Sequence, residues 1–268
     1  MDTHTSVNQK LWDELAPLHA ASRHYAVDAF VAGADTLGAV ELFEVGDVSG
    51  KRLVHLMCHF GMDTLSWARR GAQVTGVDFS SEAIRIAREL TARVRTPAEF
   101  VCSDVLLAAD VLADTFDIVF LSRGVLMWIE DIDAWARVCA RLLRPGGVFY
   151  LLDNHPLALA VTETADGIAV GGSYFHSAEP VAVVQDGSYA VTDPGMRHQE
   201  SREWTHSLGE VVTALVGAGI RIEFLHEFPG EVTATANSEG DTAPHEWSED
   251  ASARHQLPGI YSVRGVRM

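Results

Sequence analysis

The sequence predicts an α/β protein with a doubly wound sheet, on three observations. Between residues 51 and 154, short apolar segments alternate with segments of helical periodicity, the pattern of a sheet with helices on both faces. One of these segments, FDIVFLS at 116–122, is largely apolar and is typical of a strand buried on both sides. A length of 268 residues accommodates one such domain with an elaboration.

The first segment, residues 1–45, is expected to form a helical lid. Pro17 is expected to interrupt its first helix, and a second helical stretch is predicted between residues 25 and 43. The periodicity that predicts the first helix comes from apolar residues four positions apart, at Val7, Leu11 and Leu15.

The second segment, residues 46–155, holds the predicted core of the sheet. A helix over 131–143 and a Pro-Gly-Gly turn at 145–147 are expected before the last strand of this segment. Its five expected strands are at 52–57, 73–78, 99–104, 116–122 and 148–153.

The regular alternation lapses over residues 156–206, which we interpret as a β-rich insertion on the substrate side. Short β-like pieces are expected there at 181–184 and 198–206. Residues 207–268 complete the core, because Ser207 and Glu210 have capping-box spacing at the start of a helix. The last two strands are predicted at 220–228 and 259–267.

Composition narrows the partners and the compartment. Asp and Glu outnumber Lys and Arg by 37 to 20, and the net charge of -17 repels nucleic acids and anionic membranes. No segment reaches the roughly 18 apolar residues of a membrane span, and no signal peptide is visible, so a cytoplasmic location is expected. Three scattered cysteines, Cys58, Cys102 and Cys139, are expected to be buried thiols. Arginine-rich, lysine-poor usage indicates a GC-rich bacterial genome.

The junction of the first strand and first helix predicts a nucleoside site. Residues 53–64 lie where open α/β sheets bind ligands, and Asp78 ends the next strand, where a carboxylate accepts hydrogen bonds from ribose hydroxyls. A dinucleotide would require G-x-G-x-x-G, but Met57 and His59 would crowd a diphosphate and only Gly61 remains. The loop therefore favours S-adenosylmethionine, which has no phosphate, over NAD or FAD.

These segments resemble the class I S-adenosylmethionine-dependent methyltransferases. The resemblance rests on residues 53–64, 76–80, 102–105, 116–120 and 142–147, in the family's order and spacing. The chain also resembles a bacterial branch with an HLxCHFGxDTLSWARRGA loop, a leader motif from Trp12 to His19 and the late motif EWTHSLGE at 203–210.

The resemblance implies a Rossmann-like, mostly parallel sheet with an antiparallel last strand. It implies S-adenosylmethionine as cofactor and S-adenosylhomocysteine as product. Asp104 is expected at the adenine, with capping of a turn as its alternative role. The expected cofactor-binding residues are Tyr25, Met57, Cys58, His59, Gly61, Thr64, Asp78, Phe79, Ser80, Asp104, Val105 and Ser122.

The loop also departs from the family pattern. His55 stands where an acidic residue is usual, and Met57 and His59 replace two glycines. The sequence therefore leaves open how the cofactor's amino group is held. No metal site is expected, because strand alternation sends His55 and its neighbours to opposite sides.

Methyl transfer needs alignment above all, and a general base only where the acceptor starts protonated. The candidate bases are His155, Glu203 and His206, although His206 could instead only orient the helix that begins at Ser207. Aromatic side chains of the lid and the insertion would suit an apolar or aromatic acceptor. The expected substrate-binding residues are Trp12, Arg123, Tyr174, His176 and Trp204.

The predicted function is methyl transfer to N, O or a nucleophilic carbon of a small molecule, for example an aromatic natural product of specialised metabolism. A nucleic-acid methyltransferase is disfavoured by the charge and by Ser122-Arg123-Gly124-Val125, which lacks a Pro-Pro-aromatic clamp. The alternative from another class is a non-catalytic S-adenosylmethionine-binding or regulatory protein with the same fold. The sequence does not determine the oligomeric state.

Overall fold

The computed structural model describes residues 3–164, 167–185, 187–192, 195–229 and 257–268. In this part of the chain, a seven-stranded sheet has the order β12-β13-β5-β4-β1-β2-β3. Its parallel strands are β1 (Arg52–Leu56), β2 (Gln73–Asp78), β3 (Glu99–Cys102), β4 (Phe116–Ser122) and β5 (Leu143–Asn154). β13 (Pro258–Arg267) pairs antiparallel with β5, and β12 (Ile220–Pro229) pairs antiparallel with β13 at the edge of the sheet.

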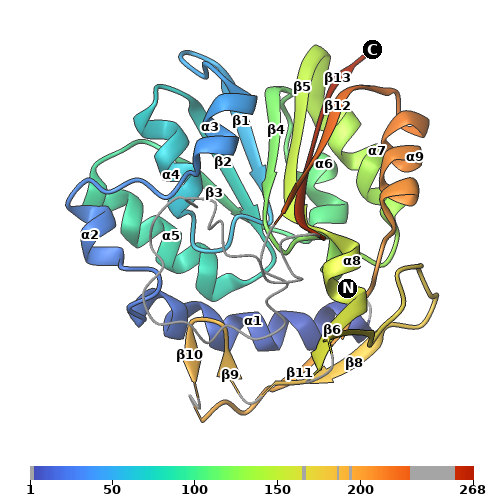
Figure 1. Ribbon diagram of the computed structural model, residues 1–268. Coiled ribbons are helices and arrows are strands. Elements are labelled where there is room, and N and C mark those ends of the chain that lie inside the picture. The colour runs from blue at the N-terminus through green and yellow to red at the C-terminus, as the bar shows by residue number, and fades with distance from the viewer. Residues whose placement is uncertain (1–2, 165–166, 186, 193–194, 230–256) are drawn as a thin grey trace.

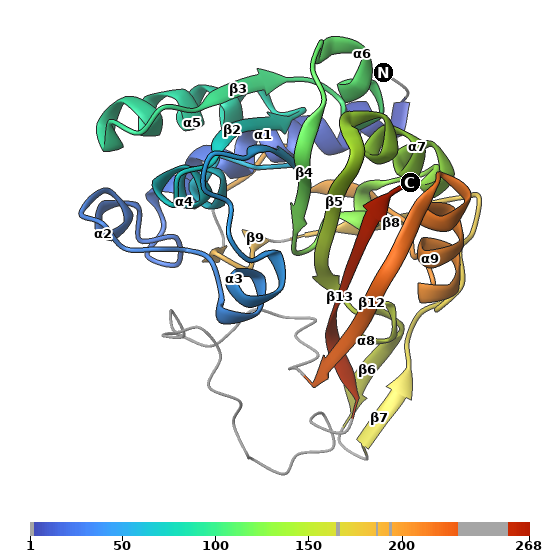
Figure 2. The same ribbon diagram turned by 90° about the horizontal axis from the view of Figure 1, so that it is seen from above.

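Helices cover both faces of this sheet (Figures 1 and 2). One face carries α3 (Ala39–Val45), α4 (Met62–Arg69) and α5 (Ser81–Val94), and the other carries α6 (Ala108–Val111), α7 (Ile132–Leu142) and α9 (Leu208–Gly217). The caps expected from sequence form, since the Ser207 side chain accepts from the Glu210 amide and Glu210 bonds back to the Ser207 amide. The doubly wound fold is confirmed.

The leader and the insertion meet below the carboxyl ends of the parallel strands (Figure 1). The long helix α1 (Thr3–Ala21) crosses this edge, and α2 (Val27–Val31) follows it. The insertion contains α8 (Pro156–Ala160) and three two-stranded antiparallel sheets: β6 (Val161–Thr164) with β7 (Gly167–Val170), β8 (Val181–Val184) with β11 (Glu200–Glu203), and β9 (Gly187–Ser188) with β10 (Val191–Thr192).

Hydrogen bonds hold α1 against the insertion. The Asn8 amide exchanges two 2.8 Å hydrogen bonds with the backbone of Arg202. The Glu14 carboxylate accepts from the backbone amides of Arg197 and His198, at 2.8 and 3.1 Å. These contacts join two segments that lie far apart in the sequence.

Several local predictions were wrong. Pro17 does not interrupt α1, because tertiary contacts with α5 and β11 outweigh the loss of one helical hydrogen bond. The stretch 25–43 contains two short helices rather than one. Residues 145–147 belong to an irregular β5, whose register with β4 shifts between Phe116 and Ile118. Cys102 is exposed because it ends β3, the edge strand.

No helix in the described ranges is long and apolar enough to cross a membrane.

Candidate cofactor and substrate site

A cavity of about 960 Å³ lies at the carboxyl ends of β1, β2 and β4. Its other walls come from α1, the segment 24–41 and the insertion residues Gln185, Ser188 and Tyr189. The cofactor-binding residues predicted from sequence that line it are Tyr25, Met57, Cys58, His59, Gly61, Asp78, Phe79 and Ser122.

The loop after β1 has the backbone of a glycine loop although it is poor in glycine. Met57, His59 and Gly61 have φ angles of 58°, 51° and 80°, all in the left-handed region. Side chains other than glycine are uncommon there and carry strain, which proteins concentrate at functional sites. The alternate positions 57, 59 and 61 thus keep the conformation that glycine would provide.

Asp78 joins this loop to β2. Its Oδ2 accepts from the His59 amide at 2.8 Å, and its Oδ1 accepts from the Ser80 amide at 2.9 Å. Burial raises the pKa of Asp78 to about 7, and these amide bonds oppose the shift. A carboxylate has about four lone-pair sites, so Asp78 retains capacity for further donors from the cavity.

Four predicted cofactor residues lie outside the lining of the cavity. The Thr64 hydroxyl is fully buried and lies 2.9 Å from His55 Nδ1. Ser80 caps α5 by accepting from the Ala83 amide at 3.1 Å. Asp104 accepts from the Leu106 amide at 2.9 Å, which is the alternative capping role, and Val105 packs in the core.

The candidate bases lie away from the cavity. His155 caps α8, and its Nε2 lies 2.9 Å from Glu227 Oε1. Glu203 accepts from the Ser201 hydroxyl at 2.6 Å, and burial raises its pKa. His206 lies 2.7 Å from the Ile129 carbonyl oxygen, and burial lowers its pKa.

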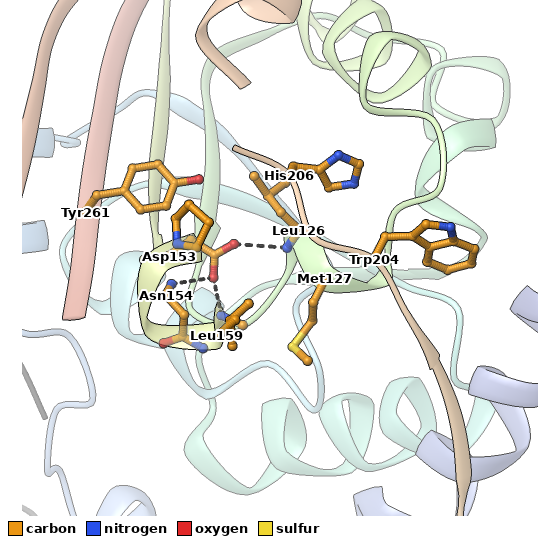
Figure 3. Close-up of a pocket in the computed structure, with 10 residues that line it drawn as sticks. Leu126, Met127, Asp153, Asn154, Leu159, Trp204, His206 and Tyr261 are labelled. Atoms are coloured by element: carbon orange, nitrogen blue, oxygen red, sulfur yellow. Dashed lines mark hydrogen bonds between the residues drawn. The ribbon is translucent and has the colours of Figure 1, made fainter. Parts of the chain in front are cut away.

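His206 and Trp204 line a second pocket of only about 20 Å³, enough for one water molecule (Figure 3). The Asp153 carboxylate organises this region by accepting from the backbone amides of Leu126 and Asn154, at 2.9 and 2.8 Å (Figure 3). His176 stacks on His206 with ring centroids 4.9 Å apart. The Tyr174 hydroxyl accepts from the Leu208 amide at 3.3 Å.

Aromatic rings cover the cavity from the lid side, and we call this group the aromatic wall. Trp12 meets the rings of His59 and Trp128 edge-on, with centroid distances of 5.3 and 5.5 Å. Burial lowers the pKa of His59 well below its usual value and also lowers the pKa of His24, so both rings are neutral near pH 7. The aromatic wall consists of Trp12, His24, Tyr25, His59, Trp128 and Tyr189.

Sequence reasoning missed three acidic residues that line this cavity, Asp35, Glu41 and Asp63. Asp63 follows the loop at the start of α4, and Glu41 comes from α3 of the leader. An acidic residue in the first turn of a helix has an ordinary role at the helix dipole, so neither position stood out. Within the described ranges, no three His, Cys, Asp or Glu side chains gather as a metal site requires.

Comparisons with known proteins bear on the fold and on the domain of residues 54–151. Residues 54–151 match the family model described as a methyltransferase domain. The structure of a putative S-adenosylmethionine-dependent methyltransferase from Listeria monocytogenes superposes with a TM-score of 0.60 at 15% identity, covering 86% of this chain and 99% of that one. One from Mesorhizobium loti gives 0.58 at 23% identity, covering 88% and 100%. The fold is that of the class I S-adenosylmethionine-dependent methyltransferases.

Curated relatives match over less than two thirds of this chain. The ubiquinone biosynthesis O-methyltransferase of Xanthomonas oryzae pv. oryzae is 33% identical over 117 residues, which are 43% of this chain and 48% of the relative. The protein of the same name from Xanthomonas axonopodis pv. citri is 30% identical over 162 residues, 59% of this chain and 66% of the relative. The chain spans about half the length of the first curated relatives it matches.

Proposed function

We propose that this protein transfers a methyl group from S-adenosylmethionine to a small-molecule acceptor. The observation that carries the proposal is the cavity at the carboxyl edge of the sheet, with its left-handed loop and the Asp78 carboxylate. The match of residues 54–151 to the methyltransferase domain supports it.

The residues of the cavity fit S-adenosylmethionine. The volume of about 960 Å³ lies at the upper end of the range for small-molecule sites, so it accommodates a cofactor and an acceptor together. Asp78 would accept from the ribose hydroxyls, and Met57 and Phe79 would supply apolar contacts. When bound, S-adenosylmethionine supplies a methyl group already activated on a sulfonium.

An aromatic small molecule is the acceptor class that the cavity supports best. The aromatic wall offers flat, largely apolar contacts, and residues of the leader and the insertion line the cavity. The net charge of -17 supports a small acceptor over a nucleic acid. Because the curated relatives are named O-methyltransferases, a phenolic oxygen is the first atom to test, ahead of nitrogen or carbon. A role in specialised metabolism is part of the proposal.

The protein's own part in the reaction is to hold the acceptor in line with the methyl group and to exclude water. Alignment of this kind lowers the barrier by several kcal/mol. For a phenolic acceptor, the neutral rings of His24 and His59, which line the cavity, would be the candidates to accept the hydroxyl proton. They are better placed for this than His155, Glu203 or His206, which lie outside the cavity lining.

Incubation with S-adenosylmethionine carrying a labelled methyl group and a panel of phenols, amines and enols tests the proposal. We expect label in at least one phenol, and we expect Asp78→Ala to lose cofactor affinity and turnover together. Asp114→Ala is the matched control, because Asp114 is exposed and pairs with Arg52 outside the cavity lining. Cofactor binding without transfer to any acceptor would favour the non-catalytic alternative. Absence of binding in calorimetry would refute both.

A further inference from the structure

Besides Asp78, the charged side chains that line the cavity include two carboxyl groups and one guanidinium group. Asp63 comes from the start of α4, Glu41 from α3 of the leader, and Arg123 from the residue after β4, and all three line the cavity. We call these three residues the charged cluster. Electrostatic interactions connect them, because Arg123 lowers and Asp63 raises the pKa of Glu41.

Asp63 has hydrogen bonds from two neutral hydroxyl groups. Its Oδ1 accepts from Thr36 Oγ1 at 2.5 Å, and its Oδ2 accepts from Ser122 Oγ at 3.1 Å. Burial raises the pKa of Asp63, while these bonds and the charge of Arg123 oppose the shift. A desolvated carboxylate of this kind gains from an added cation, because a nearby positive charge offsets the cost of burial.

Glu41 adds a second buried carboxyl group to the same wall. Glu41 is only 4% exposed, and its Oε2 accepts a hydrogen bond from the Gly38 amide at 2.7 Å. Burial, followed by the charge of Asp63, raises the pKa of Glu41 to about 7. A carboxyl group whose ionisation is disfavoured by a neighbouring carboxylate gains from a cationic group that reaches both.

His55 provides an independent observation at the same cavity. It is 2% exposed and lines the cavity, and its Nδ1 lies 2.9 Å from the Thr64 hydroxyl. Its Nε2 has no hydrogen-bond partner in the described part of the chain. Burial lowers the pKa of His55 to about 3, so β1 contributes a neutral ring with a polar atom left to satisfy.

We propose that the charged cluster binds the zwitterionic amino-acid end of the cofactor. Asp63 and Glu41 bind the ammonium group, Arg123 binds the carboxylate, and the first strand supplies only the neutral ring of His55. This inference rests on the proposed function. It assigns to Asp63 and Glu41 the part that an acidic side chain at position 55 would otherwise have. Because Glu41 belongs to α3, the leader is a part of the cofactor site as well as a lid over the acceptor.

Calorimetry on the full chain with three nucleosides tests the assignment. S-adenosylhomocysteine has the complete amino-acid end, 5′-methylthioadenosine lacks it, and decarboxylated S-adenosylmethionine keeps the amine without the carboxylate. Charged hydrogen bonds of this kind contribute about 10- to 100-fold in affinity. We therefore expect Asp63→Asn and Glu41→Gln to weaken the binding of S-adenosylhomocysteine by about that factor. We expect the affinity for methylthioadenosine to change by no more than about twofold.

Arg123→Gln separates the two charges of the ligand. We expect it to weaken the binding of S-adenosylhomocysteine and to leave the binding of decarboxylated S-adenosylmethionine unchanged. We expect Asp63→Asn to weaken the binding of both. Asp28→Asn is the matched control, because it removes one negative charge from the leader at a side chain that is 98% exposed. Circular dichroism checks that each variant is folded. If Asp63→Asn does not fold, Glu41→Gln tests the assignment separately.

The outcomes are distinct. The assignment would be overturned if both carboxyl variants lost equal affinity for S-adenosylhomocysteine and for methylthioadenosine. It would also be overturned if neither ligand lost affinity. In both cases the proposed function stands. If the unmodified protein binds none of the three nucleosides, the proposed function fails and the assignment fails with it.

Discussion

Substituting Gly76 with alanine should push apart two elements of the proposed cofactor site, β2 and the loop after β1. Gly76 lies in β2, two residues before Asp78, and the ring of Phe100 packs directly on it. An added Cβ would lie 2.5 Å from Phe100 Cε1 and 2.8 Å from Cys58 Sγ. Ordinary van der Waals contact begins at 3.4 Å, so the ring must move by nearly 1 Å or β2 must move away from the loop.

The cost follows from how firmly the ring is held. Phe100 is 6% exposed, and the same ring atom lies 2.5 Å from the position of a Cβ on Gly61, so the ring cannot move toward the loop. Overpacking of a buried site costs about 1–3 kcal/mol, and we place Gly76→Ala in the upper half of that range. Phe100→Leu removes the clashing ring and should recover at least about 1 kcal/mol of that cost in the double variant.

Urea unfolding followed by circular dichroism measures both quantities. With a slope near 3 kcal/mol per M, a loss of about 2 kcal/mol lowers the midpoint by about 0.7 M. Gly124→Ala is a useful control, since its Cβ would meet only Asn154 Nδ2, at 3.6 Å, although its φ of 72° adds backbone strain. A cost below about 0.5 kcal/mol for Gly76→Ala, or strict additivity with Phe100→Leu, would refute the reasoning.

Three further outcomes are expected. Because the pKa of Asp78 is raised to about 7, its ionisation destabilises the fold as pH rises from about 4 to about 7. A ligand that binds the ionised carboxylate should bind about tenfold more tightly for each unit by which pH rises, up to about pH 6.5. Calorimetry across that range checks this, and an unchanged slope in Asp78→Asn would contradict it. Ser207→Ala removes the cap of α9 and should cost about 1 kcal/mol in urea unfolding, whereas Ser207→Thr should cost less. Arg69→Ala removes hydrogen bonds to the Phe30 and Ala34 carbonyls and should therefore speed proteolytic cleavage near α2. An unchanged rate of cleavage would contradict this expectation.

The alternating core was predictable because its signals are local. β2 and β4 have the bounds expected from apolar runs, and α9 begins at the capping box of Ser207 and Glu210. Asp78 was predictable for the same reason, since the end of a strand and the loop before it are close in sequence. The parallel order of the strands then places them at one edge of the sheet.

The lid was less predictable because distant contacts decide it. Pro17 stays within α1 because that helix packs against α5 and β11. His155 and His206 had suitable chemistry for a base, but hydrogen bonds to Glu227 and to the Ile129 carbonyl engage them away from the cavity lining. Tyr189 faces the cavity because its hairpin meets α1, where His19 lies 2.8 Å from Ser188 Oγ.

The sequence by itself determined the sheet, the cap of α9 and the place of Asp78 at the end of β2, because periodicity and turn chemistry act over a few residues. Only the tertiary structure decided which charges line the cavity. Glu41 and Asp63 lie 22 positions apart in the chain and Arg123 lies 60 positions further on, yet α3, α4 and the end of β4 bring them to one wall. Burial there raises the pKa of both carboxyl groups, and no local pattern encodes burial that a distant segment provides.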